Sequence, residues 1–123
     1  SLQMRFHLAA LGLAAALAGS AAAADAAGNF FIMGDPGAMS CETLLTKTSD
    51  EKAGFALGVW VAGYVTALNR TTPDTYHLAG NIELSGLFQA LLDHCTKNPK
   101  DLVETAVYAT VESLYDKRQK AAP

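Results

Sequence analysis

The chain has 123 residues, of which 50% are apolar and 17% charged, with a formal charge of −3 at pH 7. This composition is typical of an ordinary folded domain and excludes a disordered or collagen-like chain. An acidic balance offers no basic surface for nucleic acid, so we expect no nucleic-acid partner.

Residues 1–24 have the pattern of a bacterial export signal. Arg5 supplies a positive charge, Leu8 to Ala18 form a short apolar run, and small residues follow up to Ala24. The run is shorter than the roughly 20 residues that a membrane span needs. We therefore expect cleavage after Ala24, a periplasmic location and no membrane partner, with Ser1-Leu2-Gln3 as a cloning remnant.

Residues 25–40 are rich in Gly, Ala, Asp and Pro and contain the turn Gly34-Asp35-Pro36-Gly37. This composition predicts a flexible N-terminal arm with little regular structure. An apolar run, Phe30, Phe31, Ile32 and Met33, lies within the arm. The run is either a short extended segment packed on the helical part, the commoner case, or an exposed patch that binds other proteins.

Two helices are predicted after the arm. Ser40 is a good N-cap for a short helix over Cys41 to Leu45, in which Glu42 lies near the positive end of the helix dipole. Ser49, followed by two acidic residues, indicates the start of a longer helix that ends near Asn69.

The longer helix is uncharged from Ala53 to Leu68 and apolar on all sides. One face carries Leu57, Trp60, Val61, Tyr64 and Leu68, and another carries Phe55, Val59 and Ala62. A helix of this kind is either buried centrally or covered by a partner chain. We expect it to form the centre of the core and to contribute to a homodimer contact, because a domain of this size buries only a modest core.

A loop over residues 70–81 precedes a third helix, whose apolar residues recur at helical spacing. They are Leu84, Leu87, Phe88, Leu91, Leu92 and Cys95. Asn98 and Pro99 then predict the start of a fourth helix, which continues to about Leu114 and ends in a basic, solubilising tail over residues 117–120.

The two cysteines, Cys41 and Cys95, are predicted to form a disulfide, because the chain is exported and the number of cysteines is even. The bond would join the first helix to the apolar stripe of the third and stabilise the fold by about 4 kcal/mol in the chain-entropy model. Residues 41–123 are therefore predicted to form a single all-α domain, a small four-helix domain held by one disulfide and followed by the basic C-terminal tail.

The sequence gives no support for an enzyme. It contains no CxxC, no HExxH, no paired histidines at ligand spacing and no glycine-rich phosphate loop. Both thiols belong to the predicted disulfide, and His77 and His94 fit ordinary surface positions. We expect no catalytic residue, no metal and no cofactor.

Three short runs resemble one family. Met39-Ser40-Cys41-Glu42-Thr43-Leu44-Leu45, Trp60-Val61-Ala62-Gly63-Tyr64 and Cys95-Thr96-Lys97-Asn98-Pro99-Lys100 are similar, in order and spacing, to the HdeA/HdeB periplasmic acid-stress chaperones. The resemblance covers Met39 to about Leu102. The sequence differs from the family in two features, a nearly uncharged central segment and a longer, more apolar helix after Cys95.

The resemblance implies a small exported all-α protein that is dimeric near neutral pH. In strong acid such proteins lose the dimer, unfold in part and use apolar surface to hold acid-denatured proteins. The surface that would contact clients or a second copy comprises Phe55, Leu57, Val59, Trp60, Val61, Tyr64 and Leu68. Without residues 1–24 the chain has eight basic and 12 acidic side chains, so acid would carry its charge from −4 to +10 once both remaining histidines are protonated.

A second family is similar in general plan. Exported, disulfide-containing helical immunity proteins of the Rap1a/Tai type bind and neutralise a single cell-wall-degrading effector. They use a specific folded surface at neutral pH, whereas a chaperone would use a nonspecific apolar surface in acid. The acid-stress chaperone is the preferred hypothesis, and an immunity or inhibitor protein is the alternative.

Overall fold

The computed structural model describes residues 23–123, so most of the predicted export signal lies outside the described part. The chain divides into two compact units, with the boundary between Phe31 and Ile32. The described part of the first unit, residues 23–31, contains a turn in which the Asp25 carboxylate accepts hydrogen bonds from the backbone N–H groups of Ala27 and Asn29. The second unit holds all the regular structure described below.

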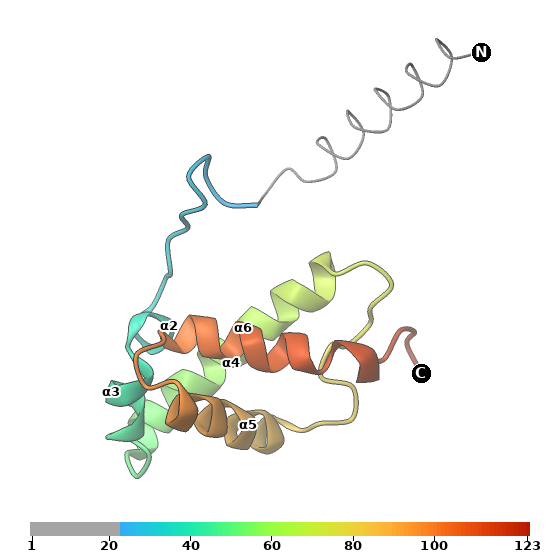
Figure 1. Ribbon diagram of the computed structural model, residues 1–123. Coiled ribbons are helices and arrows are strands. Elements are labelled where there is room, and N and C mark those ends of the chain that lie inside the picture. Colours follow the sequence, from blue (N-terminus) through green and yellow to red (C-terminus); the bar gives the residue numbers. More distant parts are fainter. Residues whose placement is uncertain (1–22) are drawn as a thin grey trace, which may run out of the picture. The chain divides into compact units, whose positions relative to one another are not determined.

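The second unit is all-α, as the sequence predicted. The helices are α2 (Asp35–Ala38), α3 (Cys41–Leu45), α4 (Glu51–Thr71), α5 (Leu84–Lys97) and α6 (Val103–Ser113), followed by the 3₁₀ turn η1 (Tyr115–Lys117) (Figure 1). No strand occurs among the described residues. The four predicted helices are all present, and α2 is an additional short helix within the predicted arm.

Side-chain caps fix the starts of α3 and α4. The Ser40 hydroxyl accepts a hydrogen bond from the backbone N–H of Thr43, as predicted. At α4 the cap is Asp50, one residue after the expected Ser49, and its carboxylate accepts from the N–H groups of Lys52 and Ala53. The local sequence therefore specifies both starts to within one residue.

The predicted start of the fourth helix is wrong. Asn98 does not cap it, because α6 begins at Val103, and residues 98–102 pair instead with the segment that enters α3. The backbone N–H of Cys41 donates to the carbonyl of Asp101 at 2.7 Å, and that of Val103 donates to Met39 at 2.9 Å. These long-range bonds satisfy backbone groups that a longer helix would have used.

The predicted disulfide is present. Cys41 and Cys95 are bonded, with Cα atoms 4.9 Å apart, and the bond joins α3 to α5 across 54 residues of chain. Both cysteines are fully buried within one apolar core to which α3, α4, α5, α6 and the segment before α5 all contribute. Its other members are Leu44, Leu57, Val61, Val65, Leu78, Ala79, Leu87, Leu91, Val103, Ala106, Val107 and Val111.

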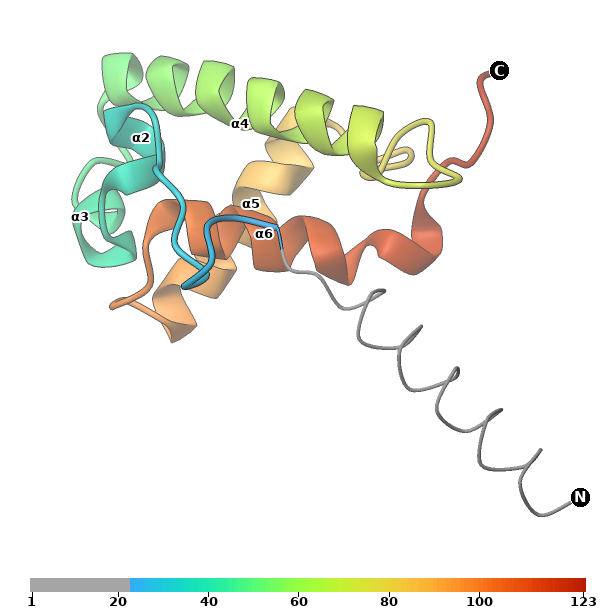
Figure 2. The ribbon, with the colours of Figure 1, turned by 90° about the horizontal axis from the view of Figure 1, so that it is seen from above.

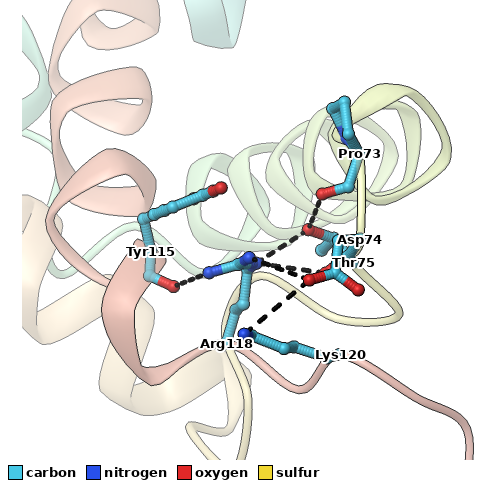
Figure 3. Close-up of polar contacts among 6 residues, drawn as sticks. All are labelled: Pro73, Asp74, Thr75, Tyr115, Arg118 and Lys120. Carbon is cyan, nitrogen blue, oxygen red and sulfur yellow. Dashed lines mark hydrogen bonds and ion pairs between the residues drawn. The ribbon is translucent and has the colours of Figure 1, made fainter.

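The loop after α4 and the C-terminal segment lie together at the end of the helices opposite α2 and α3 (Figure 2). His77 and Gln119 exchange two backbone hydrogen bonds there. The Arg118 guanidinium donates to the carbonyl of Asp74 and lies 3.6 Å from its carboxylate (Figure 3). The Arg118 side chain is only 8% exposed, so this basic residue connects the chain end to the loop rather than extending into solvent as predicted.

Candidate functional site: the exposed face of α4

The two faces of α4 that the sequence distinguishes have different surroundings. Leu57, Val61 and Val65 are buried in the core, whereas Phe55 and Val59 are exposed on the opposite side. The predicted client surface is therefore divided in the folded chain. Leu57 and Val61 are in the core, Trp60, Tyr64 and Leu68 are half-buried against it, and Phe55 and Val59 are accessible to a partner.

The exposed face is apolar over most of the helix. The Phe55 side chain is 76% exposed and Val59 59%, and Ala62 on the same side is also exposed. Gly63 has open space where a Cβ atom would lie, and no charged residue occurs between Lys52 and Arg70. Another helix or an extended chain could therefore approach this face closely without desolvating a charge.

The half-buried face of α4 is covered in part by α2. The Trp60 indole N–H donates to the carbonyl of Met33 at 2.7 Å. A Cβ atom on Gly37 would lie 2.1 Å from the indole ring, so only glycine allows α2 to pack this closely. Gly34, at the start of α2, has φ 96°, a conformation that L side chains rarely adopt. The two glycines thus hold α2 against Trp60.

A buried carboxylate lies beside the same face. Glu104 in the first turn of α6 is 8% exposed, and its carboxylate accepts a hydrogen bond of 2.9 Å from the Tyr64 hydroxyl. Burial, then the hydrogen bond and the charge of Glu104, and more weakly Tyr108, raise the pKa of Tyr64 well above its ordinary value. The Tyr64 ring stacks on Trp60 with centroids 5.1 Å apart. This chain of contacts joins α2, α4 and α6.

The second predicted patch lies on both sides of the unit boundary. Phe30 and Phe31 belong to the first unit and are exposed. In the second unit Met33 is exposed and Ile32 is half-buried. The backbone of residues 29–33 forms neither helix nor strand, and both alternatives for this run, packing on the helical part or binding other proteins, stay predictions.

The histidines make side-chain contacts that the sequence did not reveal. The Nε2 atom of His94 lies 2.9 Å from the Asp101 carboxylate, and the Nδ1 atom of His77 lies 3.3 Å from the Asn69 amide. Neither histidine belongs to a larger cluster, and residues 23–123 contain no group of three or more His, Cys, Asp or Glu that could hold a metal ion. None of the described helices is long and apolar enough to cross a membrane.

No family model, curated protein or solved structure matches this chain. The similarity to the acid-stress chaperones therefore rests only on the short runs noted in the sequence. It remains a prediction.

Sequence reasoning overlooked Glu104 and Gly37, which shape the covered side of the site. A signal existed for Glu104, because a carboxylate beside Val103, Ala106 and Val107 interrupts an apolar stripe and charged residues are seldom buried without a partner. Gly37 gave no such signal. The sequence pattern placed Gly37 in a turn. Only the packing of α2 on Trp60 shows why a side chain is excluded at this position.

Proposed function

We propose that this protein is an exported, acid-activated holdase, which binds acid-denatured proteins through apolar helix surface and prevents their aggregation. The observation that supports this most directly is the uncharged face of α4 with Phe55 and Val59 exposed on it. An apolar face of this kind in a small folded chain normally has a partner.

At neutral pH the partner of this face is a second copy of the chain. A homodimer formed by two α4 helices would bury Phe55 and Val59 twice, and the absence of charge between Lys52 and Arg70 removes the cost of desolvating ions at the contact. A symmetric contact is the commonest way in which identical chains associate.

In this proposal low pH dissociates the dimer and so activates the holdase. The chain without residues 1–24 changes from a formal charge of −4 to +10 when its 12 carboxylates and two histidines are protonated, so two copies in a dimer would repel each other. Protonation removes the negative charges while the basic side chains keep theirs, so the repulsion between the two copies grows as pH falls and each chain approaches +10. Because carboxylates far outnumber histidines, we expect the transition near pH 4 or below.

The decisive experiment is light scattering of an acid-denatured client at pH 2 to 3 and at pH 7, with and without the protein. We expect suppression of aggregation in acid only. The double variant Phe55→Ser/Val59→Ser should suppress less, because it removes apolar side chains that are already exposed and should leave the fold intact. Tyr76→Ser is the matched control, since it removes an exposed aromatic side chain from the loop after α4.

Sedimentation at both pH values tests the dimer. We expect a dimer at pH 7 that dissociates below about pH 3, and a monomer at pH 7 for Val59→Lys, which places a charge in the contact. No suppression in acid, together with a dimer that survives acid, would overturn the proposal and leave the immunity-type binding protein as the better hypothesis.

A further inference from the structure

An open groove of about 490 Å³ lies at the end of the molecule where the C-terminal segment meets the loop after α4. One wall is formed by Leu68 of α4 and by Thr72, the residue that follows this helix, and Leu78 and Val111 contribute buried apolar side chains. The other wall belongs to α6 and η1 and carries Tyr108, Glu112, Tyr115 and Asp116. The volume falls within the range of about 300 to 1,000 Å³ that small-ligand sites occupy.

The groove is negatively charged. Glu112 and Asp116 are four positions apart and both line it, and no basic side chain is among the lining residues. Two basic residues that follow Asp116 in the chain, Arg118 and Lys120, form ion pairs with Asp74 rather than with Glu112 or Asp116. Their nitrogen atoms lie 3.6 and 3.7 Å from the Asp74 carboxylate. Among residues 23–123 neither Glu112 nor Asp116 takes part in an ion pair, and the Arg118 guanidinium lies at the edge of the groove on the Tyr115 ring.

The aromatic side chains of the groove add a preference for cations. The faces of tyrosine rings attract positive charge, and Tyr115 already shows this chemistry, because the Arg118 guanidinium lies 3.8 Å from its ring centroid (Figure 3). One hydrogen bond and one ion pair to Asp74, with a further hydrogen bond to the Thr75 hydroxyl, hold the Arg118 side chain against the Tyr115 ring. Tyr108 has a nearly half-exposed side chain on the same wall.

We propose that this groove binds a small alkylammonium ion. Its positive nitrogen would lie near Glu112, Asp116 and the ring of Tyr108, and its alkyl part would lie against the half-buried side chain of Leu68, above the buried Leu78 and Val111. A carboxylate pair attracts any cation, but the apolar surface beside it favours an organic one. This site is separate from the Phe55 and Val59 face of α4 and does not depend on the holdase proposal.

The test compares choline with 3,3-dimethylbutan-1-ol, a neutral molecule of nearly the same shape, by calorimetric titration and NMR shift mapping of the full chain at pH 7. We expect choline to bind and to shift amide signals of residues 108–116, and the neutral molecule to bind at least about tenfold more weakly. Choline binding should weaken as salt is raised.

Variants assign the effect to the groove. Glu112→Gln/Asp116→Asn should weaken choline binding about tenfold or more, whereas Glu42→Gln, an exposed carboxylate on α3, should leave it unchanged. Tyr108→Leu should weaken binding and Tyr108→Phe should restore it, because phenylalanine keeps the aromatic face. Equal binding of the two probes, no binding of either, or shifts that map elsewhere would each overturn the proposal.

Discussion

The two faces of α4 are made from similar side chains but have opposite environments. Leu57 and Val61 are almost fully buried, whereas Phe55 and Val59 on the other side are mostly exposed. Hydropathy therefore does not explain which face is inside. Helices α5 and α6 pack against one face, α2 covers its edge at Trp60, and no other part of residues 32–123 covers the exposed face.

The glycines of α4 and α2 show the same contrast. Gly54 and Gly63 lie where an added Cβ would meet nothing within 4 Å, while Gly37 lies against the Trp60 indole. A methyl group added at Gly54 or Gly63 would therefore meet no neighbour, whereas the absence of one at Gly37 allows α2 to pack closely on α4. Substitutions at matched positions on the two sides can therefore separate folding from association.

The largest expected difference is between Leu57→Ala and Phe55→Ala. Leu57→Ala leaves a cavity in the core and should lower the free energy of unfolding by about 2 to 5 kcal/mol. Phe55→Ala should change it by about 0.5 kcal/mol or less in dilute solution, because the side chain is exposed. Urea unfolding at several protein concentrations measures both.

The same series of protein concentrations also tests whether the exposed face of α4 forms the dimer contact. If α4 forms the dimer contact, the urea midpoint of the wild type should rise with protein concentration, and that of Phe55→Ala should rise less. A large loss of stability for Phe55→Ala in dilute solution would show that the exposed face is covered within one chain.

The next effect contrasts two glycines. Gly37→Ala should destabilise by about 1 to 3 kcal/mol, because the new methyl group would overlap the Trp60 ring and displace α2. Gly54→Ala should stabilise by up to about 1 kcal/mol, since alanine is the better helix former and the site is open. Thermal unfolding of both variants checks the signs, and Trp60 fluorescence should change only for Gly37→Ala.

The smallest expected effect concerns Tyr64. Its hydroxyl keeps its proton in the folded chain because its pKa is raised, whereas an unfolded chain releases the proton near pH 10. The stability that this group contributes is therefore complete below about pH 10 and is lost as pH rises further.

Comparison of the wild type with Tyr64→Phe tests whether the stability contributed by the Tyr64 hydroxyl decreases at high pH. The variant should be less stable than the wild type by about 1 kcal/mol at pH 8, because the Glu104 carboxylate loses its donor. The difference should shrink at pH 11. Tyr76→Phe is the control for an exposed tyrosine, and a difference between wild type and Tyr64→Phe that does not change between the two pH values would contradict the expectation.

Several elements could be predicted because their signals are local. The apolar residues of α5 recur at helical spacing, and Ser40 supplies the cap of α3 within a single turn. The disulfide followed from the number of cysteines and the export pattern. Other features depended on distant partners. The start of α6 moved to Val103 because residues 98–102 pair with the chain before α3, and no local signal records that pairing.

The candidate site shows the same limit. The apolar character of α4 and its division into two faces were visible in the sequence, because the helical period places residues three and four apart on one side. The sequence could not say which face would be exposed, since both are apolar. The burial of Glu104 beside Tyr64 and the position of Arg118 likewise depended on segments 40 and 44 residues away in the chain.

The sequence by itself determined the helical class, the approximate extent of three helices and the existence of a fourth, the cysteine pair and the uncharged length of α4. These properties depend on side-chain periodicity, caps and composition, which act over a few residues. Only the tertiary structure decided that α2 packs on Trp60, that the basic chain end is tied to Asp74, and that Phe55 and Val59 face outward. Those outcomes depend on which distant surfaces fit together, because close packing selects among faces of similar hydropathy.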